Sequence, residues 1–192
     1  GLTRDGRHLV FASLDWRSTL LRAAFDPVRE QLAGPPVPVL RSTLPIRDHD
    51  LSPDGQWVTL TSAGATEDVL VARLDGSPYR RLTDDARCAG ATFLPDGDLA
   101  YVHRGESRSE VLRIGLDGGP AAPLLAATVD VADPDAMTIT GDGRHLVAPV
   151  VVGEANPGVA AVMTGQPPVD LYIARIGKGK LRRIETPQPF KW

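Results

Sequence analysis

Asp-Gly dipeptides recur along this chain at a nearly fixed spacing, and this recurrence limits the available folds more than any other feature. Four of the six Asp-Gly dipeptides mark the first turn of each repeat and begin at Asp5, Asp54, Asp96 and Asp142. A second turn signal follows the first three of them after 21 residues each time, at Asp26, Asp75 and Asp117. The full repeat, from Asp54 to Asp96, is 42 residues long. A period of roughly 40–45 residues is typical of the four-stranded blades of β-propellers.

Apolar residues occupy the same columns in every repeat. The column after the first turn reads Leu9-Val10-Phe11, Val58-Thr59-Leu60, Leu99-Ala100-Tyr101 and Leu146-Val147-Ala148. Short apolar runs separated by Gly-containing turns are typical of antiparallel strands, because Gly supplies the positive φ that tight turns need. One such sheet cannot bury both of its faces alone, so neighbouring repeats must stack. The sequence therefore predicts four short strands per repeat, packed face to face.

The predicted fold is an all-β propeller with four four-stranded antiparallel blades. We place the blades at residues 1–42, 43–84, 85–126 and 127–185, and residues 186–192 at the start of a next or closing strand. The sequence opens at Gly1 within a first strand and reaches Trp192 before another turn signal. We therefore expect one propeller region that forms an arc of a larger ring.

Two strings of the second repeat carry a family resemblance. They are Leu51-Ser52-Pro53-Asp54-Gly55-Gln56-Trp57-Val58 and Leu74-Asp75-Gly76-Ser77-Pro78-Tyr79-Arg80-Arg81-Leu82-Thr83. Both resemble the TolB-type propeller repeat, found in Tol-Pal translocation proteins and in propellers fused to bacterial winged-helix regulators or Ser/Thr kinases. The resemblance covers almost the whole chain. It implies a non-catalytic module of a bacterial envelope or signalling protein that binds a protein or peptide or acts as a sensor. The implied location is the periplasm or another extracytoplasmic compartment, and a cytoplasmic location is not excluded by the sequence.

Charge and hydropathy argue against two classes of partner. The net charge is −3, so we expect no nucleic-acid partner and no anionic-membrane surface. The most apolar stretch, Leu146–Val152, is far shorter than a membrane span, so no membrane insertion is expected. The paired arginines Arg80-Arg81 and Arg182-Arg183 hold matching places in two repeats and are interpreted as a solvated strand face.

The sequence holds no catalytic constellation, and we predict no catalytic residue, no metal and no cofactor. Cys88 is the single cysteine, which excludes the cysteine-based zinc patterns. A Gly-x-Ser-x-Gly elbow, a phosphate loop and a dinucleotide fingerprint are all missing from the sequence. The string Asp130-x-x-Asp133-x-Asp135 is similar to part of a cation-binding loop but lacks its Gly and distal Glu. His8 and His145 share a repeat position with Trp57 and are interpreted as packing residues.

Departures from the period identify one end of the blades. With strands labelled a to d from the channel outward, the b–c and d–a connections share one end, which we call the connection end. The a–b and c–d turns share the other, the turn end. The fourth repeat has 4 extra residues before Asp142 and 14 after it, both at the connection end, whereas the first has 7 extra between Asp26 and Leu40 at the turn end. Loops on rigid scaffolds often carry function. The larger insertion, residues 153–168, is therefore predicted to be a contact loop, acting through Val159 and Met163.

Polar residues without equivalents in other repeats gather at the same connection end. Asp68, in contrast, has equivalents in Glu110 and Asp170 and is interpreted as part of the repeat. Convergent polar groups at the mouth of a propeller suit a ligand or peptide site. The predicted binding residues are Arg47, His49, Asp85, Asp133, Asp135, Val159 and Met163.

Two other functions stay open at this point. One is the substrate-gating propeller of a prolyl-oligopeptidase-like serine peptidase whose catalytic domain lies outside this chain. The other is a metal-dependent carbohydrate lyase, which would need His and carboxylate side chains meeting in the channel, with His49 and His103 as the candidates. A kinase, winged-helix or hydrolase domain fused outside this chain would decide between these functions.

Overall fold

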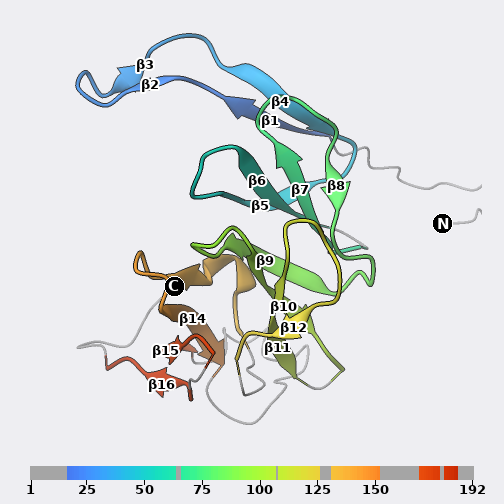
Figure 1. The fold of residues 1–192 in the computed structure, drawn as a ribbon, viewed down its shortest axis with the longest axis vertical. Helices are drawn as coiled ribbons and strands as arrows, with labels where there is room; N and C mark the ends of the chain where they lie inside the picture. The colour runs from blue at the N-terminus through green and yellow to red at the C-terminus, as the bar shows by residue number, and fades with distance from the viewer. Residues whose placement is uncertain are drawn as a thin grey trace, which may run out of the picture.

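The chain folds into a succession of small antiparallel sheets (Figure 1). The structure is a computed structural model and describes residues 17–63, 66–106, 108–125, 131–151, 169–177 and 180–185. Within these residues the regular elements are strands and one short 3-10 turn, η1 (Pro134–Ala136). No helix in these ranges is long and apolar enough to cross a membrane. The described part of the chain is thus all-β, as the repeat predicts.

Three of the sheets have four strands each, arranged in chain order. The second blade contains β5 (Ile46–Leu51), β6 (Trp57–Ser62), β7 (Val69–Arg73) and β8 (Arg80–Arg81). The third contains β9 (Cys88–Phe93), β10 (Leu99–Arg104), β11 (Ser109–Ile114) and β12 (Ala122–Pro123). The fourth contains β13 (Thr138–Ile139), β14 (His145–Val151), β15 (Val169–Arg175) and β16 (Arg182–Arg183). All neighbouring strands in these sheets are antiparallel.

The first blade is represented by a long hairpin. Its base pairs β1 (Ser18–Arg22) with β4 (Val37–Ser42), and its far part pairs β2 (Phe25–Asp26) with β3 (Gln31–Leu32). The seven extra residues of the first repeat lie in this hairpin, which extends away from the other sheets (Figure 1). The first two strands expected in this blade fall in residues 1–16, outside the described residues.

The Asp-Gly turns have the same internal hydrogen bonds in the second and fourth blades. In the second, Asp54 Oδ1 accepts from the Gln56 N–H at 3.0 Å, and Ser52 Oγ accepts from the Trp57 N–H at 2.9 Å. Asp142 and Thr140 play the same parts for Arg144 and His145, at 3.0 and 3.1 Å. Both turns place Gly at positive φ, 66° and 67°. The repeated dipeptide thus marks one local geometry between strands a and b.

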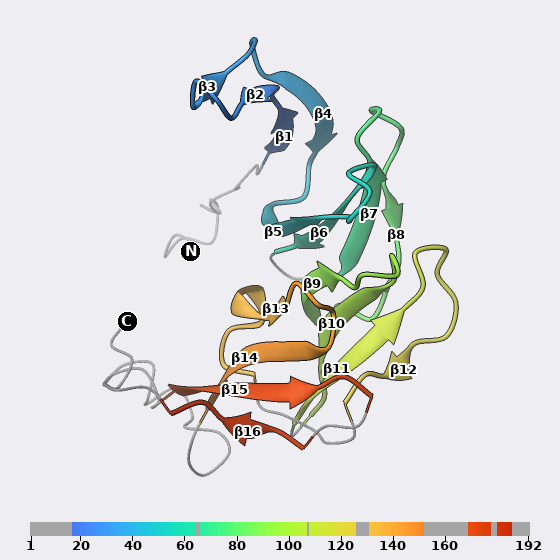
Figure 2. The ribbon, with the colours of Figure 1, turned by 60° about the vertical axis from the view of Figure 1, so that its left-hand side comes forward.

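Apolar clusters between successive blades hold the sheets together. Leu40 of the hairpin packs with Val58 and Leu60 of the second blade. The opposite face of that blade packs through Val69 and Val71 against the third, which contributes Cys88, Phe93, Leu99 and Tyr101. The third and fourth blades meet in a larger cluster that includes Val102, Val111, Leu146 and Ala148. Each blade therefore buries its apolar surface against its neighbours, and the sheets follow an arc with β5, β9 and β13 on its inner side (Figure 2).

The Arg-Arg pairs lie exposed on the short outer strands β8 and β16, where a solvated strand face was expected. Arg81 lies 3.6 Å from the buried carboxylate of Asp68. Arg183 lies 2.8 Å from Asp170, which is the repeat equivalent of Asp68. Arg80 donates to the backbone carbonyl of Asp117 in the next blade at 3.0 Å. These arginines have structural partners within and between blades.

Candidate binding groove

A chain of ion pairs crosses three blades at the connection end. Arg47 of β5 binds Asp135 of η1 with two nitrogens, Nε at 2.5 Å and Nη2 at 3.1 Å. Its third nitrogen, Nη1, lies 2.9 Å from Glu67 Oε1, and Glu67 also pairs with Arg104 at the end of β10. Residues of the second, third and fourth blades are thereby joined by alternating charges. The network therefore fixes the relative positions of the connections at this end of the three blades.

A bulge in β5 places Arg47 in this network. Ile46 pairs with Ser62 and Asp48 with Thr61, so Arg47 is an extra residue in the ladder. Bulges commonly redirect a side chain at the edge of a sheet. Burial lowers the pKa of Arg47, but the Asp135 hydrogen bond and the neighbouring carboxylates outweigh it and raise the pKa above its usual value. Arg47 therefore remains charged at every physiological pH.

Asp133 and Gly90 determine where Asp135 lies. Asp133 caps η1, and its Oδ1 accepts from the Asp135 N–H at 3.2 Å. Gly90 of β9 has φ +60°, and a Cβ atom there would lie 2.0 Å from the Pro134 carbonyl oxygen. A side chain at that position would therefore displace η1. Asp133 thus acts through the turn that holds Asp135.

Beside this network, the inner strands form a groove with two adjoining hollows. The acidic hollow, of about 230 Å³, is lined by Asp48, His49, Asp50, Thr92, Asp135 and Thr138, among others. The apolar hollow, of about 330 Å³, is lined in part by Leu51, Pro53, Phe93, Pro95 and Ile139. Both share Asp50, Thr92 and Thr138, which occupy the same position in three successive repeats. We call the two hollows together the inner groove.

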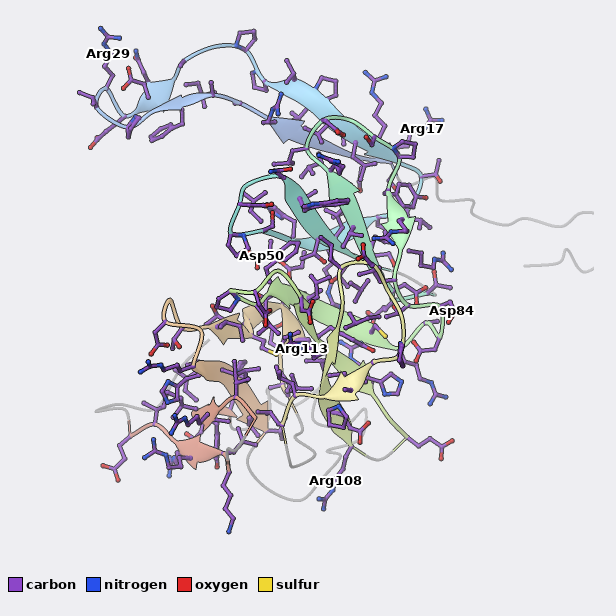
Figure 3. The ribbon with its side chains drawn as sticks, in the orientation of Figure 1. Arg17, Arg29, Asp50, Asp84, Arg108 and Arg113 are labelled. Carbon is purple, nitrogen blue, oxygen red and sulfur yellow. The ribbon has the colours of Figure 1, made fainter. Side chains whose placement is uncertain are left out.

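Asp50 links the second and third blades within this groove. Its Oδ2 accepts from the Thr92 hydroxyl at 2.7 Å and from the Phe93 N–H at 2.8 Å. Figure 3 shows its labelled side chain at the boundary between these two blades. The carboxylate that shapes the middle of the groove is therefore committed to holding two inner strands together.

Asp48 differs from the other carboxylates of the groove. Burial raises its pKa, a hydrogen bond from the His49 backbone opposes this, and the charge of Asp135 raises it further. Among the described residues, no cationic side chain forms a salt bridge with Asp48. Of the carboxylates in the acidic hollow, Asp50 is held by the Thr92 hydroxyl and the Phe93 N–H and Asp135 by Arg47, so Asp48 is the one without a cross-blade partner among the described residues.

Asp85 lies apart from the inner groove, in the connection between the second and third blades. It lies 2.8 Å from His103 Nε2 and accepts from the Cys88 thiol at 3.1 Å. Burial raises the pKa of Asp85, but these bonds and the Arg87 N–H outweigh it and lower the pKa. Cys88 is 1% exposed, and burial raises the pKa of its thiol to about 12, so it does not act as a nucleophile at neutral pH.

The structure thus brings four of the seven predicted binding residues together and places Asp85 apart from them. Arg47, His49, Asp133 and Asp135 lie at or beside the acidic hollow. Val159 and Met163 fall outside the described residues. Sequence reasoning missed Thr92, Thr138 and Arg104. The two threonines could have been found from their repeat position, one residue before Phe93 and Ile139.

Metal-ligating groups do not cluster in the described ranges. No group of three His, Cys, Asp or Glu residues there has the geometry to hold a metal ion. His49 lines the acidic hollow, whereas His103 is paired with Asp85 outside the groove. The two histidines therefore do not meet in one site.

Solved structures share this architecture. A putative TolB from Agrobacterium tumefaciens matches with a TM-score of 0.63 at 16% identity, over 95% of this chain and 62% of that chain. TolB from Acinetobacter baumannii matches with a TM-score of 0.61 at 17% identity, over 95% and 47%. An oligogalacturonate lyase in complex with manganese matches with a TM-score of 0.55 at 17% identity, over 78% and 39%. No protein-family model and no curated protein matches the sequence.

The three matched structures share one fold, although two are named TolB and the third is named a lyase. The chain spans 47% and 62% of the two TolB structures, so it corresponds to part of a propeller of that kind. Stacked four-stranded sheets, the repeat strings and these matches support one another. The chain has the fold of a TolB-type β-propeller.

Proposed function

We propose that this chain is a non-catalytic propeller module that binds a protein or peptide segment in its inner groove. The observation that carries the proposal is the groove itself, which runs across the inner strands of three blades and combines an acidic with an apolar hollow. Ligand sites are concave, largely apolar and equipped with a few convergent polar groups. The inner groove fits that description.

The rigidity of the groove supports the same proposal. Its walls are tied across blades by Asp50 and by the Arg47 network, and Asp133 fixes η1. A preformed site saves the entropy of ordering its residues when a ligand binds. The titratable groups near the groove are mostly engaged in these cross-blade contacts, which suits recognition better than proton transfer.

The proposal can be tested by selecting peptides from a random 12-residue library displayed on phage. We expect selected peptides to bind the chain and to lose most of their affinity for Asp48→Lys. Asp117→Lys is the matched control, because Asp117 is exposed at the turn end and its substitution brings the same change of charge. Circular dichroism would confirm that both variants fold. Equal binding by the two variants would contradict a ligand site in the groove.

The TolB-type fold also supports a place in the bacterial envelope or in a signalling protein. We propose a periplasmic or other extracytoplasmic location for the parent protein, where the partner would be another protein of that compartment. Cell fractionation with an antibody against this chain tests the location. Recovery of the parent protein only with cytoplasmic markers would overturn it without affecting the groove.

A further inference from the structure

The two hollows of the inner groove adjoin but differ in chemistry. The apolar hollow is lined by Leu51, Phe93 and Ile139, whereas the acidic hollow is lined by Asp48, Asp50 and Asp135. Their shared residues place them directly side by side along β5. A ligand that fills both must therefore carry two different groups close together.

Only one of the three carboxylates is available to a ligand. Asp50 is engaged by the Thr92 hydroxyl and the Phe93 N–H, and Asp135 is bound by two nitrogens of Arg47. Asp48 has no salt bridge among the described residues, and burial together with the charge of Asp135 raises its pKa. A cation placed beside Asp48 would relieve this crowding of negative charge. The groove therefore complements a positively charged group at one defined point.

The distance between the hollows sets the spacing of the two groups. Asp48 marks the acidic hollow and Leu51 the apolar hollow on the same strand. In an extended chain, residues i and i+2 point to the same side and lie about 7 Å apart. Asp48 and Leu51 lie three residues apart on β5, roughly 10 Å along the strand, and the length of a Lys or Arg side chain covers the difference. An extended segment can thus direct one side chain into each hollow.

Building on the proposed function, we infer that the inner groove binds an extended protein segment in which Lys or Arg is separated by one residue from a large apolar residue. The cationic group lies against Asp48, and the apolar side chain enters the hollow beside Leu51. The charge of Asp48 and the apolar lining of the neighbouring hollow together define this partner chemistry.

The probe is a fluorescein-labelled peptide of sequence Gly-Ser-Arg-Ser-Leu-Ser-Gly, with its ends blocked, titrated by fluorescence polarisation at low salt. Two control peptides replace the arginine by glutamine or the leucine by serine. We expect each control to bind about five- to tenfold more weakly, since each loses the contact with one hollow. Raising the salt should weaken binding of the arginine peptide more than that of the glutamine peptide.

Variants of the chain assign each contact to its hollow. Asp48→Asn should abolish the preference for arginine over glutamine, and Leu51→Ser should abolish the preference for leucine over serine. Leu51 is 54% exposed, so its substitution should leave the fold intact, and Tyr79→Ser, at 38% exposure on the outer side, is the matched control. Preferences that survive in both groove variants would overturn the inference.

The inference and the proposed function can fail separately. If the library yields peptides that bind the groove but lack a basic residue near an apolar one, the inference is wrong and the groove remains a binding site. If every selected peptide binds Asp48→Lys as tightly as it binds the unchanged chain, the proposed function fails as well.

Discussion

The turn end and the connection end of the same blades are built on opposite principles. At the turn end, the carboxylates of Asp54, Asp75, Asp96 and Asp142 accept hydrogen bonds within their own turns, so the pattern recurs in all three four-stranded blades. At the connection end, Arg47 joins Glu67 of its own blade to Asp135 of the fourth blade, and no other repeat reproduces this arrangement among the described residues. The repeat therefore builds the scaffold and the shared wall of the groove, and departures from the repeat build the ion-pair network beside it.

The largest expected effect comes from adding a methyl group where two blades touch. Gly90→Ala should lower the free energy of unfolding by about 2–4 kcal/mol, because its Cβ would meet the Pro134 carbonyl and its φ is positive. Gly118→Ala, at φ +88° in a turn with no atom within 4 Å, should cost about 1 kcal/mol from backbone strain alone. Urea unfolding measures both. Equal losses would show that η1 does not pack tightly on β9.

Asp50 should matter more than an Asp of the repeated turns. Asp50→Ala should lower the free energy of unfolding by about 2 kcal/mol, because it leaves the Phe93 N–H and the Thr92 hydroxyl without their acceptor. Asp142→Ala removes bonds within a single exposed turn and should cost less. Thermal unfolding of the two variants gives the order. A larger loss for Asp142→Ala would contradict a cross-blade role for Asp50.

Arg47 and Arg113 offer a matched pair, because each binds two carboxylates. Arg113 joins Asp96 and Asp98 near one turn of the third blade, whereas Arg47 joins different blades. Replacing either by Gln should cost at most about 1 kcal/mol, since both pairs are partly exposed. Only Arg47→Gln should speed hydrogen exchange at Asp135 and Ala136 in η1. Unchanged exchange there would mean that η1 does not depend on the network.

The smallest expected effects are those of pH, and they have opposite signs at the two ends. The pKa of Asp142 is lowered by the Thr140 hydroxyl and the Arg144 N–H, so its contribution to stability is present above the unfolded pKa and is lost as pH falls through the folded pKa. The pKa of Asp48 is raised, so its ionisation destabilises the fold as pH rises. Asp48→Asn should therefore raise Tm slightly at pH 7 and leave it unchanged at pH 3. Asp142→Asn should lower Tm at pH 7, and calorimetry at both pH values tests the pair.

The sequence predicted the regular part of the molecule well, because its signals are local. An Asp-Gly dipeptide specifies a turn through its own φ and hydrogen bonds, so the strands around Asp54 and Asp142 could be placed from spacing alone. The all-β fold and the TolB-type resemblance are both confirmed by the sheets and the solved structures.

The site was only partly predictable, because its geometry depends on contacts between blades. The extra residue in β5 that turns Arg47 toward Asp135 leaves no signal in the local sequence. The inner strand of the fourth blade is the two-residue β13, since Pro134 lacks an N–H and Asp133 caps a 3-10 turn shortly before it. Thr92 and Thr138 carry no chemical signature, and their repeat position, one residue before Phe93 and Ile139, was the one sequence feature that marked them as walls of the two hollows.

Hydrogen–deuterium exchange with and without a library-selected peptide tests the central claim most directly. If the chain binds its ligand in the inner groove, protection should appear in β5, β9, η1 and β13, and the turns at Asp75 and Asp117 should exchange as before. Protection confined to those turns or to the outer strands β8, β12 and β16 would contradict a binding site on the inner side of the arc.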